Sequence, residues 1–103
     1  MHRNYTRTIP REWRAMARVF VALGDEHRQR ILLTFERGER LTVGQIAEVS
    51  TLSRPAVSHH LKILREAGVL KREKVGRESH FWIDRAPLEA ALAAVLAYVR
   101  DHA

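Results

Sequence analysis

The stretch TVGQIAEVSTLSRPAVSHHLKILREAG, residues 42–68, holds two short helical patterns separated by a polar break. Thr42 is a suitable N-cap for the first helix, and Ser53 for the second. Pro55 stands in the first turn of the second helix, where no intrahelical N–H bond is lost. Apolar side chains recur on one side of each helix, at Val43, Ile46, Ala47 and Val49 in the first and at Val57, Leu61 and Leu64 in the second. Two short helices joined by a few residues predict a helix-turn-helix.

The second helix of this motif carries polar and basic side chains opposite its apolar side. A face of this kind suits the major groove of DNA, whose base edges present hydrogen-bond donors and acceptors. We therefore predict DNA contacts along it, at Ser53, Arg54, Pro55, Ser58, His59, Lys62 and Arg65.

A β-hairpin is predicted directly after the motif. Gly68 ends the helix, two short strands follow, and the segment Val75–Glu78 between them contains Gly76, which can adopt a positive φ. A hairpin this small is marginal alone, so it must pack on the helices, for which Val69, Phe81 and Ile83 are suited. Its basic residues extend the predicted DNA surface, with Arg72, Lys74 and Arg77 towards the tip.

Three further helices complete the pattern. The first runs from about Pro10 to Leu23, and the second from an N-cap at Asp25 to about Arg37, before Gly38. Its expected buried residues are Ile31, Leu32 and Phe35. The last helix covers about residues 86–103. The order α-α-α-α-β-β-α predicts a mainly α fold with a small β-hairpin, a winged helix-turn-helix.

Length and composition favour one DNA-binding domain. The chain has 103 residues with 46% hydrophobic content, which suits a flexible tail over residues 1–9 and one domain over 10–103 with dimerisation helices at both ends. It has no cysteine, and no apolar run long enough to span a bilayer, so we expect a cytoplasmic protein without membrane contact. The net charge is +6, and seven Lys or Arg stand against two acids between Arg54 and Arg77. This local surplus favours a polyanionic partner.

Three segments resemble the ArsR/SmtB family of repressors. They are ALGDEHRQRIL at residues 22–32, LSRPAVSHHLKILREAGVL at residues 52–70, and Gly76-Arg77 followed by an aromatic strand. Together they cover about residues 20–84 in the family's order. The resemblance implies a homodimer that binds a palindromic double-stranded operator and represses until an effector loosens the DNA.

The dimer is expected to form through the first and last helices. Apolar residues recur at three- and four-residue steps in both, and they exceed what one small domain can bury. The candidate interface residues are Trp13, Met16, Phe20, Leu88, Leu92, Val95 and Val99.

Neither metal site that the family resemblance implies is complete. Thr42 and Gly44 occupy the positions of the family's cysteine pair. The family's second site, on the last helix, meets Ala86, Ala97 and Arg100 where it needs ligands. We therefore predict no metal and no cofactor, and an effector, if one exists, that is a small molecule other than a thiophilic metal. A weak zinc site across the dimer stays open, formed by His102, Asp101 and a tail histidine of the partner chain.

Two other function classes are alternatives to a DNA-binding repressor. The first is a winged helix that only contacts proteins, which would not need both a basic helix face and a basic hairpin. The second is an enzyme: Ser58 beside His59 could suggest a nucleophile and a base, but no orienting acid or oxyanion arrangement is visible nearby. We therefore predict no enzymatic activity.

Overall fold

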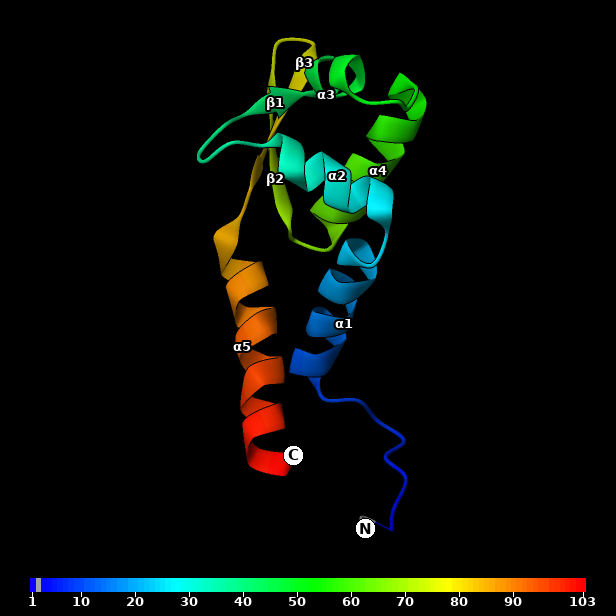
Figure 1. The fold of residues 1–103 in the computed structure, drawn as a ribbon, viewed down its shortest axis with the longest axis vertical. Helices are drawn as coiled ribbons and strands as arrows, with labels where there is room; N and C mark the ends of the chain where they lie inside the picture. The colour runs from blue at the N-terminus through cyan, green and yellow to red at the C-terminus, as the bar shows by residue number, and fades with distance from the viewer. Residues whose placement is uncertain (2) are drawn as a thin grey trace.

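The computed structural model describes Met1 and residues 3–103, and it confirms the winged helix-turn-helix class (Figure 1). The elements in chain order are α1 (Arg11–Leu23), α2 (Glu26–Thr34), β1 (Leu41–Thr42), α3 (Val43–Val49), α4 (Arg54–Glu66), β2 (Leu70–Val75), β3 (Glu78–Ile83) and α5 (Arg85–His102). The strands form one antiparallel sheet in the order β1-β3-β2, so the predicted hairpin gains a short third strand.

The predicted caps hold the helix-turn-helix in place. The Thr42 hydroxyl accepts a hydrogen bond from the Gln45 backbone N–H, and the Gln45 side chain accepts one from the Thr42 N–H, which makes a capping box. The Ser53 hydroxyl accepts from the Ala56 N–H at the start of α4. Val57, Leu61 and Leu64 are fully buried, as predicted. Val49 is not: it is 70% exposed at the end of α3, so its place on the apolar side was wrong.

The second helix ends earlier than predicted. α2 stops at Thr34, and Phe35 already has an extended backbone although its side chain is buried. Gly38, with φ of +73°, turns the chain back so that Leu41 pairs with Phe81 on β3. The prediction of a helix to Arg37 is therefore wrong, because pairing with a distant strand outweighs the local helical pattern.

The β2–β3 hairpin is the wing of the fold. Its loop is only Gly76 and Arg77, shorter than the predicted segment, because Val75 and Glu78 pair with each other. A type II′ turn requires a positive φ at the first of its two central residues only. Gly76 has φ of +64°, and Arg77 does not have a positive φ, so the loop fits this turn type. The base of the wing packs on the helical core through Val69, Leu70 and Phe81, all buried.

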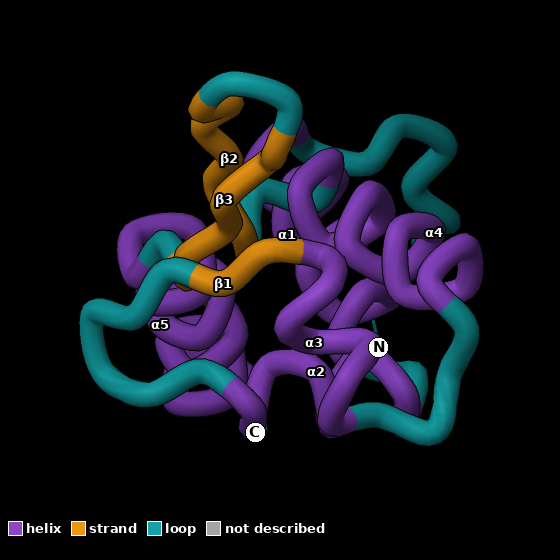
Figure 2. Tube along the Cα trace, turned by 90° about the horizontal axis from the view of Figure 1, so that it is seen from above, coloured by secondary structure: helices purple, strands orange, loops and turns teal. Residues whose placement is uncertain are grey.

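The molecule is elongated, because α1 and α5 lie side by side and project away from the core (Figure 1). The Trp13 and Tyr98 rings meet edge to face, with centroids 5.0 Å apart. The described chain measures 53 × 24 × 22 Å with a radius of gyration of 16.3 Å, against about 13 Å for a compact domain of this length. Figure 2 shows the sheet with β3 between the other two strands, beside the helices. Among the described residues, no helix is both long and apolar enough to cross a membrane.

Candidate nucleic-acid interface

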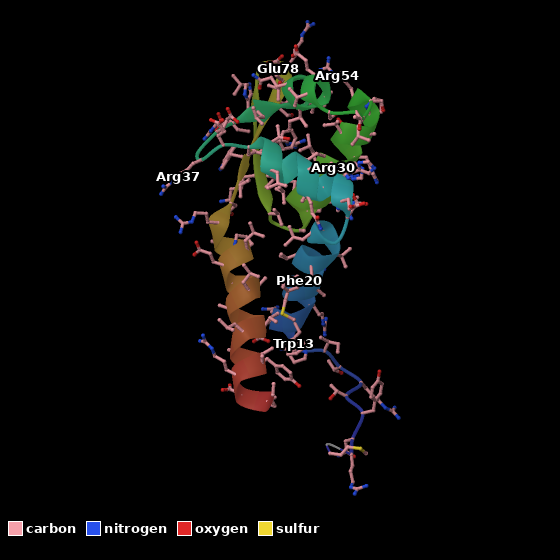
Figure 3. The ribbon with its side chains drawn as sticks, in the orientation of Figure 1. Trp13, Phe20, Arg30, Arg37, Arg54 and Glu78 are labelled. Atoms are coloured by element: carbon pink, nitrogen blue, oxygen red, sulfur yellow. The ribbon has the colours of Figure 1, made fainter. Side chains whose placement is uncertain are left out.

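The side of α4 that is predicted to contact DNA, opposite its buried side, is open to solvent. Four of its side chains are exposed, and Arg65, nearest the core, is half-buried. The exposed ones are Arg54, Ser58, His59 and Lys62. Ser53 and Pro55 are exposed at the start of the helix, where the Ser53 oxygen is already engaged as the N-cap. In Figure 3, Arg54 lies at the same end of the molecule as Glu78 of the wing.

A basic hollow of about 230 Å³ separates α4 from the wing. It brings together Ser58, Lys62 and Arg65 of α4 with Arg72 of β2. The remaining lining residues are Val43, Ser79 and Phe81. Within the described chain, Arg65 and Arg72 have no ion pair, and the Lys62 ammonium lies 3.9 Å from the Glu66 carboxylate. A phosphate group would therefore find three cations and the Ser79 hydroxyl around one depression.

The other predicted wing residues lie farther out on the hairpin. Lys74 is on the same sheet face as Arg72, since side chains two positions apart point the same way, and its partner on β3 is Ser79. Arg77 is in the loop and exposed. Sequence reasoning missed Ser79, although an antiparallel hairpin centred on Gly76-Arg77 already pairs it with Lys74.

Arg40 is a basic residue that sequence reasoning did not single out. Its guanidinium lies 4.0 Å from the ring centroid of Trp82, and it also pairs with the Glu73 carboxylate at 3.6 Å. Both partners belong to the sheet, one on each wing strand. This contact ties the segment before β1 to the wing and partly satisfies the charge of Arg40.

A second polar cluster joins α4 to the α1–α2 junction. The Arg28 guanidinium donates to the carbonyl oxygens of Ala22 at 2.7 Å and Val21 at 3.2 Å, and it contacts His60 Nδ1 at 3.3 Å. Since Arg28 can only donate, this contact requires His60 Nδ1 to be the unprotonated acceptor. Burial lowers the pKa of His60, the Asp25 carboxylate raises it by a smaller amount, and Arg28, His27 and His59 lower it further. The cluster therefore favours neutral His60.

Folding stability is expected to fall as the solution is acidified through the titration range of His60. Its pKa is lowered in the folded chain, so the unfolded chain takes up the proton first. The stabilisation is complete above the ordinary value of 6.5 and is lost as the pH falls through the folded-state pKa. Tm should therefore decrease between about pH 7.5 and pH 5, and less so in His60→Gln, which keeps an acceptor without titrating. Matching pH profiles for the two proteins would contradict this assignment.

The histidines form no metal centre in the described residues. The His27 and His60 ring centroids are 5.7 Å apart and those of His59 and His60 are 5.8 Å apart. No group of three or more His, Asp or Glu side chains in Met1 and residues 3–103 is placed to hold an ion. The weak zinc site across a dimer stays a prediction: His102 is on α5 with its ring stacked on Tyr98, and the tail histidine, His2, lies outside the described residues.

The predicted dimer residues divide into two groups. Met16 and Leu88 are half-buried against the chain's own core, and Val95 is also half-buried. The others expose large apolar areas, namely Trp13 (38%), Phe20 (37%), Leu92 (56%) and Val99 (47%). Trp13 and Phe20 are both on α1 in Figure 3. The exposed large apolar side chains of α5 also include Leu96 and Tyr98, which were not predicted as interface residues.

Comparison with known proteins gives consistent matches. The model for "Bacterial regulatory protein, arsR family" matches residues 25–72. The transcriptional repressor SdpR of Bacillus subtilis is 32% identical over 84 residues, which are 82% of this chain and 92% of that protein. A transcriptional repressor SmtB homolog of Synechocystis is 39% identical over 66 residues, 64% of this chain and 49% of that protein. An ArsR-like transcriptional regulator from Rhodococcus sp. RHA1 superimposes with a TM-score of 0.78 at 29% identity, covering 86% of this chain and 83% of that one.

Proposed function

Since this chain belongs to the ArsR family of bacterial regulatory proteins, we propose that it is a homodimeric repressor that reads a palindromic operator with α4 and the wing of each protomer. That it is a DNA-binding transcriptional regulator follows from family membership. The relatives are transcriptional regulators, which fits the prediction that this chain has no enzymatic activity.

The basic hollow carries the proposal for the DNA surface. Its cations come from α4 and β2, two elements that a winged helix places against adjacent parts of a duplex, and Arg65 and Arg72 have no acidic partner in the described chain. Phosphate contacts of this kind set the register of a protein on DNA, and base contacts add specificity. We assign base contacts to Arg54, Ser58 and His59 near the start of α4, and phosphate contacts to Lys62, Arg65, Arg72, Lys74 and Arg77.

The exposed side of the α1–α5 pair supports the dimer. A single small domain rarely leaves so many large apolar side chains on one projecting pair of helices. A second copy packed there would bury them and would place two α4 helices for the two halves of a palindrome.

The proposal excludes a thiolate-bound metal as the effector and leaves open whether an effector exists. The chain contains no cysteine, and Thr42 and Gly44 stand at the positions of the family's cysteine pair. Arsenite or cadmium should therefore leave operator binding unchanged, and release of the DNA by either ion would contradict this part.

Electrophoretic shift with the DNA upstream of the protein's own gene tests the proposed function. The protein should bind one segment far more tightly than unrelated DNA of equal length. Alanine at Arg54 or His59 should then reduce discrimination at single base pairs by about 1 to 3 kcal/mol, while binding to unrelated DNA changes little. Arg77→Ala is the matched comparison, because loss of a phosphate contact should weaken all sequences alike. Equal binding of every sequence by the wild type would favour a winged helix that contacts proteins.

A further inference from the structure

Gly44 is in α3 without a backbone reason for glycine. It is the second residue of the helix, and it is not among the glycines with positive φ, which are Gly38, Gly68 and Gly76. Glycine in a helix is less stable than alanine because it loses more backbone freedom on folding. An explanation for Gly44 must therefore come from what surrounds it.

The three atoms nearest to the open side of Gly44 all belong to the guanidinium of Arg54. A β-carbon at Gly44 would lie 3.1 Å from Arg54 Nη2, 3.5 Å from Cζ and 3.8 Å from Nη1. The Nη2 end is nearest, so the guanidinium packs against the first turn of α3. Arg54 has no ion pair or side-chain hydrogen bond elsewhere in the described residues. Its packing against Gly44 is therefore not accompanied by a polar contact within those residues.

We propose that Gly44 is a positioning residue, which seats the Arg54 guanidinium against the first turn of α3 and so pre-organises it for DNA. This inference rests on the proposed function, in which Arg54 reads base edges. An arginine already held near its bound placement loses less side-chain freedom on binding, so the operator complex is stabilised. Glycine at position 44 thus makes α3 less stable than alanine would, but it leaves room for the Arg54 side chain of α4.

Gly44→Ala separates stability from recognition. The variant should raise Tm by roughly 2 to 5 °C, because alanine is the better helix former. It should also weaken operator binding about fivefold, as expected for coupled neighbours, without changing binding to unrelated DNA. Gly44→Leu should weaken it further, since a larger side chain displaces the guanidinium more. Val49→Ala is the control: it raises helix propensity at an exposed site of the same helix away from Arg54, and should leave both affinities unchanged.

A double-mutant cycle with Arg54→Ala decides the mechanism. In the Arg54→Ala background, Gly44→Ala should no longer change operator affinity, because the group that it displaces is gone. The inference is overturned if the loss persists in that background, which would mean that DNA itself needs close approach to α3. It is also overturned if Gly44→Ala alone leaves operator binding unchanged or tighter. Failure of the wild type to select an operator would contradict the proposed function instead, so the two failures are distinguishable.

Discussion

Operator affinity is expected to fall by about three to five decades between roughly 50 and 200 mM salt. The proposed phosphate contacts of each chain are Lys62, Arg65, Arg72, Lys74 and Arg77, so the proposed dimer would neutralise about six to ten phosphates. Every neutralised phosphate releases condensed counterions, and the slope of log affinity against log salt is about −0.9 for each. Fluorescence anisotropy with labelled operator at five or more salt concentrations measures this slope directly.

Two variants locate the charges responsible for that slope. Arg72→Ser removes a cation of the basic hollow, and the dimer should lose about two units of slope, one from each protomer. Lys71→Ser is the matched control: Lys71 neighbours Arg72 in β2 but points to the other sheet face, with its ammonium 3.7 Å from the Asp84 carboxylate. It should leave the slope near the wild-type value. A flat salt response in the wild type, or equal changes in both variants, would refute the assigned surface.

Leu92→Asp is expected to convert the protein into folded monomers that lose about a hundredfold or more in operator affinity. Leu92 is 56% exposed in the single chain, so a carboxylate there leaves the fold intact but would be buried without a partner in the dimer. Monomers bind one half-site and forgo the gain from linking two binding events. Light scattering coupled to size-exclusion chromatography gives the mass, and circular dichroism reports the fold.

A control on another helix separates the interface from general surface effects. Leu33 on α2 is 84% exposed and lies outside the α1–α5 pair, so Leu33→Asp should remain dimeric and bind the operator normally. A Leu92→Asp protein that keeps its helical spectrum and its dimer mass would show that the subunits associate through another surface.

The helix-turn-helix could be predicted from the sequence because its signals are local. Ser53, Pro55 and Gly68 act on the backbone within a turn of themselves, and the spacing of Val57 and Leu61 gives the buried side of α4 directly. The candidate DNA residues on α4 follow from the same spacing, since whatever lies opposite the buried side faces solvent. Their contacts with DNA stay predictions.

The errors occur where distant segments meet. The helical pattern through Arg37 is present in the sequence, yet α2 ends at Thr34 because Leu41 has to reach Phe81, forty residues away along the chain. Val49 follows the helical spacing of the apolar residues before it, but its side chain at the end of the short helix α3 is 70% exposed. The contacts of Arg28 with His60, and of Arg54 with Gly44, likewise join separate elements and have no local signature.

The sequence by itself therefore determined the order of helices, the caps, the wing turn at Gly76 and the sign of the charge on the candidate DNA surface. Each depends on backbone preferences or side-chain spacing within a few residues. Only the tertiary structure decided where β1 forms, that Ser79 and Arg72 line the same hollow as Lys62, and that Arg54 rests on Gly44. These features depend on the distance and orientation between packed elements, which are set by burial of the shared core around Leu61 and Phe81 rather than by any single segment.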